Sequence, residues 1–208
     1  MKVIVYSIGR SGSTLIEQIT SAHSDVKVRH SHTKVQNYLR RKMIVPYRDF
    51  RSVLVSYWRT SADIPMEALA HGRKMRREEI LDYTKRITDN VLVMEDNLHR
   101  NGHSLVLKYE EFYNDFEFLF DEIGGYINRP YTQNKRADLR DKFNIQSNRK
   151  RAEKLSNFGQ WDKDGIHGGH VLTGAPDSWR DLVSVEDHEM FNEGLSDVLK
   201  RWGYSTLW

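Results

Sequence analysis

The sequence predicts an α/β domain with three layers, α/β/α, around a central parallel sheet of about four or five strands. Short apolar runs rich in β-branched residues alternate with amphipathic segments of helical period, which is the pattern of βαβ units. The first run ends at a glycine-containing loop that opens a helix. We expect residues 1–208 to form a single domain, because a chain of 208 residues can bury one sizeable core.

The expected strands are short and apolar, and cover residues 2–8, 26–30, 42–47 and 104–108. The expected helices cover residues 13–22, residues 34–40, a segment after Asp49, and residues 78–101, where apolar side chains recur at three- and four-residue steps. Residues 109–120 should be largely helical, with Gly124 and Gly125 closing that unit. Residues 144–180 predict a helix fragment and then a long loop. The last helix should begin at Ser184, whose hydroxyl can cap Asp187, and end at Trp202.

Composition excludes several classes of protein. The absence of cysteine excludes a disulfide framework and a thiolate metal site, and it fits a reducing, cytoplasmic compartment. The N-terminus has no leader-peptide pattern, and the apolar runs are too short to span a membrane. A net charge of +3 is too small for a general nucleic-acid binder, although a local positive cleft would favour an anionic ligand.

A candidate anion site follows the first strand. Backbone amides at the start of a helix favour phosphate or sulfate, glycines allow close approach, and an arginine can neutralise charge. A Walker A loop is excluded because no lysine precedes the hydroxyl pair. The bland alternative is a tight turn before a capped helix. The site residues are Gly9, Arg10, Ser11, Gly12, Ser13 and Thr14.

A second candidate anion site follows the third strand. Arg48 stands at the strand end and Ser56 lies two helical turns further on, so both could reach one phosphate. Taken alone, each has a plainer interpretation, as a surface arginine at a turn and a solvated helix residue. Two anion loops at the carboxyl ends of neighbouring parallel strands favour a shared ligand site.

These two segments resemble the sulfotransferase family, in which the first would be the phosphosulfate loop and the second the 3′-phosphate segment. Arg48 and Ser56 have the family's spacing of eight, whereas Ser52 stands where the family commonly has aspartate. The resemblance implies a P-loop NTPase-like fold and the donor 3′-phosphoadenosine 5′-phosphosulfate (PAPS). The product would be adenosine 3′,5′-bisphosphate (PAP), and Arg10 would stabilise charge on the leaving phosphate. No metal is implied.

Residues 28–33 resemble the family segment that supplies the proton-accepting histidine, which makes His32 the expected base. His30 would occupy the family's lysine position and could be the base instead, or neither histidine could be. An imidazole suits the role because its pKa lies near neutrality. Tyr109, in a segment resembling the family's strand-to-tyrosine motif, would lie near the adenosine or simply pack at the sheet edge. Glu110 could orient loop residues.

The C-terminal part resembles the family's glycine-rich lid only loosely. The basic triplet that grips the 3′-phosphate in many members appears here as His167-Gly168-Gly169. Arg149, Lys150 and Arg151 could replace it, although a basic run is more often a solvated face. Leu15 stands where many members have a tryptophan, so adenine would stack elsewhere, with Trp58 and Trp179 as candidates.

The expected function is therefore in-line transfer of a sulfuryl group from PAPS to a hydroxyl or amine acceptor. That acceptor could be a small molecule, a saccharide or a peptide. Two other functions remain open. One is a divergent P-loop nucleotide or small-molecule kinase, which would need magnesium and a substitute for the missing lysine. The other is a non-catalytic binder of PAP.

Overall fold

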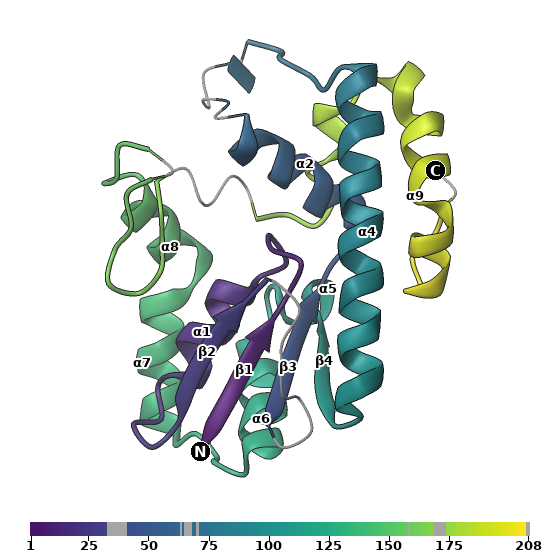
Figure 1. Cartoon of the computed structure of the whole chain (residues 1–208). Coiled ribbons are helices and arrows are strands. Elements are labelled where there is room, and N and C mark those ends of the chain that lie inside the picture. Colours follow the sequence, from purple (N-terminus) through teal and green to yellow (C-terminus); the bar gives the residue numbers. More distant parts are fainter. Residues whose placement is uncertain are drawn as a thin grey trace.

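A four-stranded parallel sheet in the order β2-β1-β3-β4 forms the centre of the computed structural model (Figure 1). The strands are β1 (Lys2–Tyr6), β2 (Lys27–Ser31), β3 (Lys42–Tyr47) and β4 (Ser104–Lys108). The predicted strands and fold class are confirmed. The structure describes residues 1–32, 41–62, 64, 68–69, 71–157, 159–168 and 174–206, so the helix expected over 34–40 lies outside the described residues.

Both faces of the sheet are covered, as expected for parallel strands. Alternate side chains of β1 point to opposite faces: Ile4 and Tyr6 join one buried cluster, and Val3 and Val5 join the other. This period of two, applied to an apolar run, divides the core into two layers.

The first cluster packs under α2 (Phe50–Ser61), α4 (Arg77–Asn101) and α9 (His188–Arg201). The long helix α4 lies along this face beside α9 (Figure 1). It ends as predicted, because Gly102 adopts the left-handed conformation, with φ 66°, that closes many helices.

The second cluster packs under α1 (Ser13–Thr20), α5 (Tyr109–Phe112), α6 (Phe116–Ile127) and α7 (Gln133–Phe143). The expectation that Gly124 and Gly125 close a helix is wrong, because α6 continues through both. A Cβ atom on Gly124 would lie 3.1 Å from the Arg129 carbonyl oxygen, so this glycine permits close packing. The helix ends instead at Asn128, in the left-handed conformation with φ 56°.

The C-terminal third contains α8 (Ile145–Ala152), irregular chain, and two short 3-10 helices, η2 (Arg180–Leu182) and η3 (Val185–Asp187). The Ser184 hydroxyl accepts a hydrogen bond from the Asp187 amide at 3.3 Å, as predicted. The cap starts η3, and α9 follows it. Across the described ranges, no helix combines the length and the apolar character that crossing a membrane requires.

Candidate functional site

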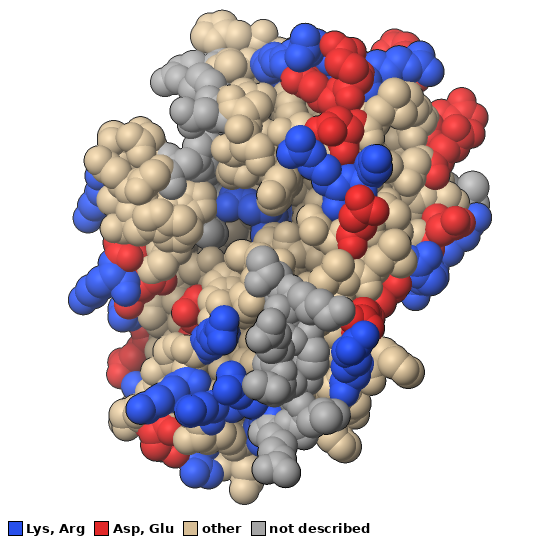
Figure 2. Space-filling model, in the orientation of Figure 1, with Lys and Arg blue, Asp and Glu red and all other residues tan. Residues whose placement is uncertain are grey.

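A cavity of about 540 Å³ opens at the carboxyl ends of the strands and is lined by both predicted anion segments. Figure 2 shows a hollow on this face with Lys or Arg side chains inside it. Ser11 does not line the cavity, because its side chain is fully buried. Its hydroxyl has no hydrogen-bond partner among the described residues. The other predicted site residues all line it, namely Gly9, Arg10, Gly12, Ser13, Thr14, His32, Arg48, Ser56 and Tyr109.

The loop between β1 and α1 has an unusual backbone. Gly9, Arg10 and Gly12 all have positive φ angles, of 84°, 58° and 87°. Gly12 caps α1, and a Cβ atom there would lie 2.9 Å from the ring of Tyr109. Glycine is therefore required both for the conformation and for the close approach. Arg10 is not a glycine, so its positive φ angle is strained and must be stabilised by contacts with the surrounding residues.

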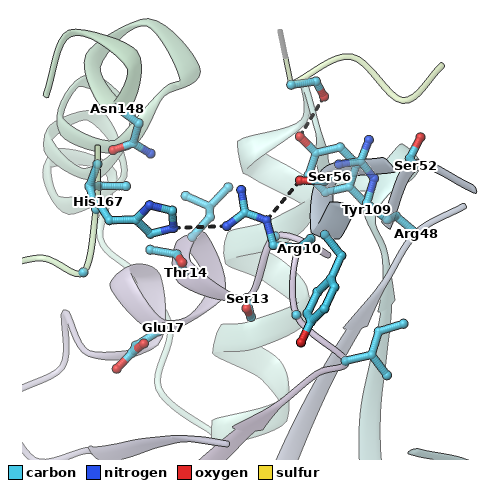
Figure 3. Close-up of a pocket in the computed structure, with 18 of the residues that line it drawn as sticks. Arg10, Ser13, Thr14, Glu17, Arg48, Ser52, Ser56, Tyr109, Asn148 and His167 are labelled. Atoms are coloured by element: carbon cyan, nitrogen blue, oxygen red, sulfur yellow. Dashed lines mark hydrogen bonds between the residues drawn. The ribbon is translucent and has the colours of Figure 1, made fainter. Parts of the chain in front are cut away.

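Arg10 lies at the centre of the cavity, between two side chains from distant parts of the chain (Figure 3). Its Nε donates to Ser56 Oγ at 3.0 Å, and its Nη1 donates to His167 Nε2 at 3.1 Å. Burial, reinforced by the Arg59 and Arg48 charges, lowers the pKa of Arg10 to about 9. The guanidinium nevertheless stays protonated at neutral pH.

Two further guanidinium groups reach the cavity. Arg48 is buried, stacks 4.5 Å from the centre of the Tyr109 ring, and donates to the Ala175 carbonyl at 3.3 Å. Its Nε is buried and makes no hydrogen bond with any described residue. Arg59 lines the cavity from α2 with 2% exposure, and burial lowers its pKa to about 10.

The charge around the cavity is strongly unbalanced. Three guanidinium groups line it, whereas Glu17 is the single carboxylate among the described lining residues. The Glu17 carboxylate lies 3.1 Å from His30 Nδ1, so its partner is this imidazole. A cluster of buried like charges is costly, and an anion with more than one charge would relieve that cost.

The start of α2 is fixed by contacts with α5, which is in turn held by the segment after α9. Asp49 caps the helix by accepting from the Arg51 amide at 2.9 Å, and the Asp49 amide donates to Glu110 Oε1 at 3.0 Å. Glu110 also accepts from the Tyr204 hydroxyl at 2.8 Å. These contacts hold Asp49, the residue next to Arg48, in place. Glu110 is therefore positioned to orient the residues at the start of α2, as suggested from the sequence.

His32 is placed with one defined tautomer. Its Nδ1 lies 2.9 Å from the Ser7 carbonyl oxygen, which can only accept, so Nδ1 carries the hydrogen and Nε2 keeps a lone pair. Burial, and then the nearby His30 and Arg10, lower the pKa of His32 below its ordinary value. The imidazole is therefore neutral at pH 7, which is the form that can accept a proton.

Two features of the site were not found from the sequence. Arg59 lies three residues after Ser56 and seven after Ser52, on the same face of α2, so helical periodicity could have indicated it. His167 was named only as part of the altered triplet, and its contact with Arg10 had no local signal, because the two residues are 157 positions apart in the chain.

Two suggestions made from the sequence are wrong. Trp58 and Trp179 are fully buried in the core beneath α2 and α9 and do not line the cavity, so neither can stack on an adenine. The basic run of α8 does not line it either. Arg151 instead pairs with Asp162 and Asp164, at 2.5 and 2.9 Å, and holds the loop that carries His167.

The buried imidazole of His167 predicts an acid-sensitive fold. Burial, with Arg10 and Arg59 nearby, lowers the pKa of His167 to about 4. Below about pH 6.5 the imidazole of residue 167 is protonated in the unfolded chain but still neutral in the folded chain. The free energy of unfolding therefore falls as the pH falls. We expect a loss of up to about 3 kcal/mol between pH 7 and pH 4. Urea unfolding across this range should show a shallower loss for His167→Gln, and equal slopes for both proteins would contradict this role.

Comparison with solved structures shows that the chain has the sulfotransferase fold. Each of three crystal structures matches 96% of this chain. Retinol dehydratase with androsterone and the inactive cofactor PAP aligns with a TM-score of 0.68, 14% identity and 80% of its chain covered. Retinol dehydratase with retinol and PAP gives 0.66, 15% and 81%. Mouse sulfotransferase SULT7A1 with PAP gives 0.67, 14% and 84%. No family profile and no curated protein sequence matches the chain.

Proposed function

We propose that the protein is a PAPS-dependent sulfotransferase. The observation that carries the proposal is the convergence of two anion-binding elements on one cavity, the β1–α1 loop with Arg10 and the β3–α2 junction with Arg48. A nucleotide with phosphate groups on both its 3′ and 5′ oxygens needs two such elements. The buried Nε of Arg48, which has no partner among the described residues, is a hydrogen-bond donor that a phosphate oxygen would satisfy.

The two anion-binding elements would hold different parts of the donor. Arg10, the loop amides and the hydroxyls of Ser13 and Thr14 would hold the 5′-phosphosulfate. Arg48 and Ser56 would hold the 3′-phosphate, with Tyr109 beside the adenosine. When bound, PAPS supplies the sulfuryl group, which passes to an acceptor oxygen or nitrogen with PAP as the leaving group. His32 Nε2 would take the proton that the acceptor loses.

The order of the strands supports this division. His32 follows β2, the edge strand on one side of β1, whereas Arg48 and Tyr109 follow β3 and β4 on the other side. The acceptor would therefore enter beside β2, and the nucleotide would extend over β3 and β4. A kinase is less well supported because the loop has no lysine and the second anion element has no task in binding ATP.

A comparison of nucleotides tests the binding site. We expect PAP to raise the melting temperature more than ADP or ATP does, because its 3′-phosphate reaches Arg48 and Ser56. The measurement is thermal unfolding at equal, saturating nucleotide concentrations, with and without magnesium. Equal shifts for the three nucleotides, or the largest shift with magnesium and ATP, would reject the proposal.

A further inference from the structure

The acceptor side of the cavity contains a second pair of groups, Glu17 and His30. The Glu17 carboxylate can only accept, so its contact of 3.1 Å with His30 places a hydrogen on Nδ1, and in the neutral tautomer with that hydrogen the lone pair is on Nε2. That Nε2 makes no hydrogen bond within the described part of the chain. The His30 and His32 rings meet edge to face with their centres 4.4 Å apart, and both line the cavity, so two imidazoles that can accept at Nε2 are neighbours there.

Two adjacent hydrogen-bond acceptors match a ligand that offers two adjacent donors. A single phenol or isolated alcohol offers one hydroxyl, whereas neighbouring hydroxyl groups on one ring offer two. Buried acceptors that stay unpaired cost free energy, so a ligand that satisfies both imidazoles is favoured over one that satisfies one.

A groove of about 620 Å³ continues from this side of the cavity. It runs between α1, α7 and the loop of residues 161–165, and it shares Glu17 and Trp161 with the cavity lining. Carboxylates and ammonium groups line it in nearly equal numbers, which favours a polar ligand without net charge. These groups are Glu17, Asp138, Asp162 and Asp164, with Lys135, Lys142 and Lys163.

Of the two aromatic side chains that line this groove, Phe143 is buried and Trp161 is 63% exposed. Its backbone pairs with that of His167 in an isolated bridge, and the two rings meet edge to face at 4.7 Å. Asp162 Oδ1 accepts from the Ile166 amide at 2.9 Å, and Arg151 pairs with Asp162. The indole is therefore held by a braced loop, and an exposed ring on such a loop is a preformed stacking platform.

We infer that the acceptor is a neutral saccharide of more than one sugar unit, bound in this groove with one sugar ring on the face of Trp161. The apolar face of a sugar ring fits an indole, and its hydroxyls fit the mixed carboxylates, ammonium groups and the Gln18 amide that line the groove. A neighbouring pair of hydroxyls then meets His30 and His32. This inference rests on the proposed function.

The test is a glycan microarray probed with the fluorescently labelled 208-residue chain in saturating PAP. Neutral oligosaccharides are printed beside anionic oligosaccharides and peptides. We expect neutral oligosaccharides to bind, Trp161→Ala to bind about tenfold more weakly, and Trp161→Phe to recover part of the loss. Leu92→Ala removes another exposed apolar side chain, on α4 and outside the groove, and should bind as the unchanged protein does.

Preference for anionic oligosaccharides or peptides, absence of binding to neutral oligosaccharides, or equal binding by the unchanged protein and Trp161→Ala would each overturn the inference. Calorimetric titration with PAP, run on every variant, separates this result from the proposed function. Intact PAP binding without glycan binding rejects the saccharide acceptor alone. Failure to bind PAP rejects the proposed function, while the array read without PAP still tests the groove.

Discussion

Replacing His32 with alanine is expected to lower turnover by roughly 10²–10⁴-fold while leaving the affinity for PAP nearly unchanged. The bond from Nδ1 to the Ser7 carbonyl fixes the tautomer, and burial keeps the ring neutral. Removing the ring removes the proton acceptor without touching Arg10 or Arg48, which would hold the donor. The measurement is sulfuryl transfer under saturating PAPS, with PAP binding titrated in parallel.

His30→Ala is the matched comparison, because it removes the neighbouring imidazole of the same pair. We expect a smaller fall in kcat and a higher KM for the acceptor, since His30 would bind the acceptor and His32 would take its proton. The lowered pKa of His32 also predicts that activity rises with pH to a plateau whose midpoint lies below pH 6.5. Full activity in His32→Ala would reject the assignment, and a collapse only in His30→Ala would transfer the role.

Replacing Arg48 with alanine is expected to weaken PAP binding by about 1–3 kcal/mol, the range for losing a charge-assisted hydrogen bond. The affinity for ADP should change much less, because ADP has no 3′-phosphate. The Arg48 side chain also stacks on Tyr109 and bonds the Ala175 carbonyl, so part of its effect could come through the fold.

Arg48→Lys separates these contributions to PAP binding. Lysine keeps the positive charge but loses the planar group that stacks on Tyr109 and presents several donors, so an intermediate affinity is expected. The melting temperature of each variant without nucleotide reports the structural part. Unchanged dissociation constants for PAP in both variants would remove Arg48 from the site.

Local patterns in the sequence were sufficient to predict the sheet and most of its helices. Apolar β-branched runs specify buried strands, and the period of residues 78–101 specifies α4, because both patterns reflect which face is buried. Helix α7 was missed for the same reason. Its buried residues are Leu139 and Phe143 only, so no apolar stripe marks it. The glycines of α6 were misjudged because their packing against residues 129 and 130 is a tertiary contact.

The candidate site was predictable where its residues follow a strand directly. Arg10, His32 and Arg48 all lie just beyond strand ends, and parallel strands bring such residues together. Contacts between distant segments were not predictable, since nothing near His167 marks it as a partner of Arg10. The burial of a single side chain cannot be read from the local sequence. Trp179 was therefore proposed as a stacking residue although it lies in the core.

The most direct test of the central claim is transfer of radiolabelled sulfate from PAPS, measured as label that becomes attached to an acceptor. The unchanged protein is incubated with labelled PAPS and a broad mixture of acceptors that includes neutral oligosaccharides, and labelled products are identified by mass analysis. We predict labelled acceptor and equimolar PAP with the unchanged protein, and little of either with His32→Ala. Tight binding of PAP without any labelled acceptor would contradict the account and indicate a non-catalytic nucleotide-binding protein.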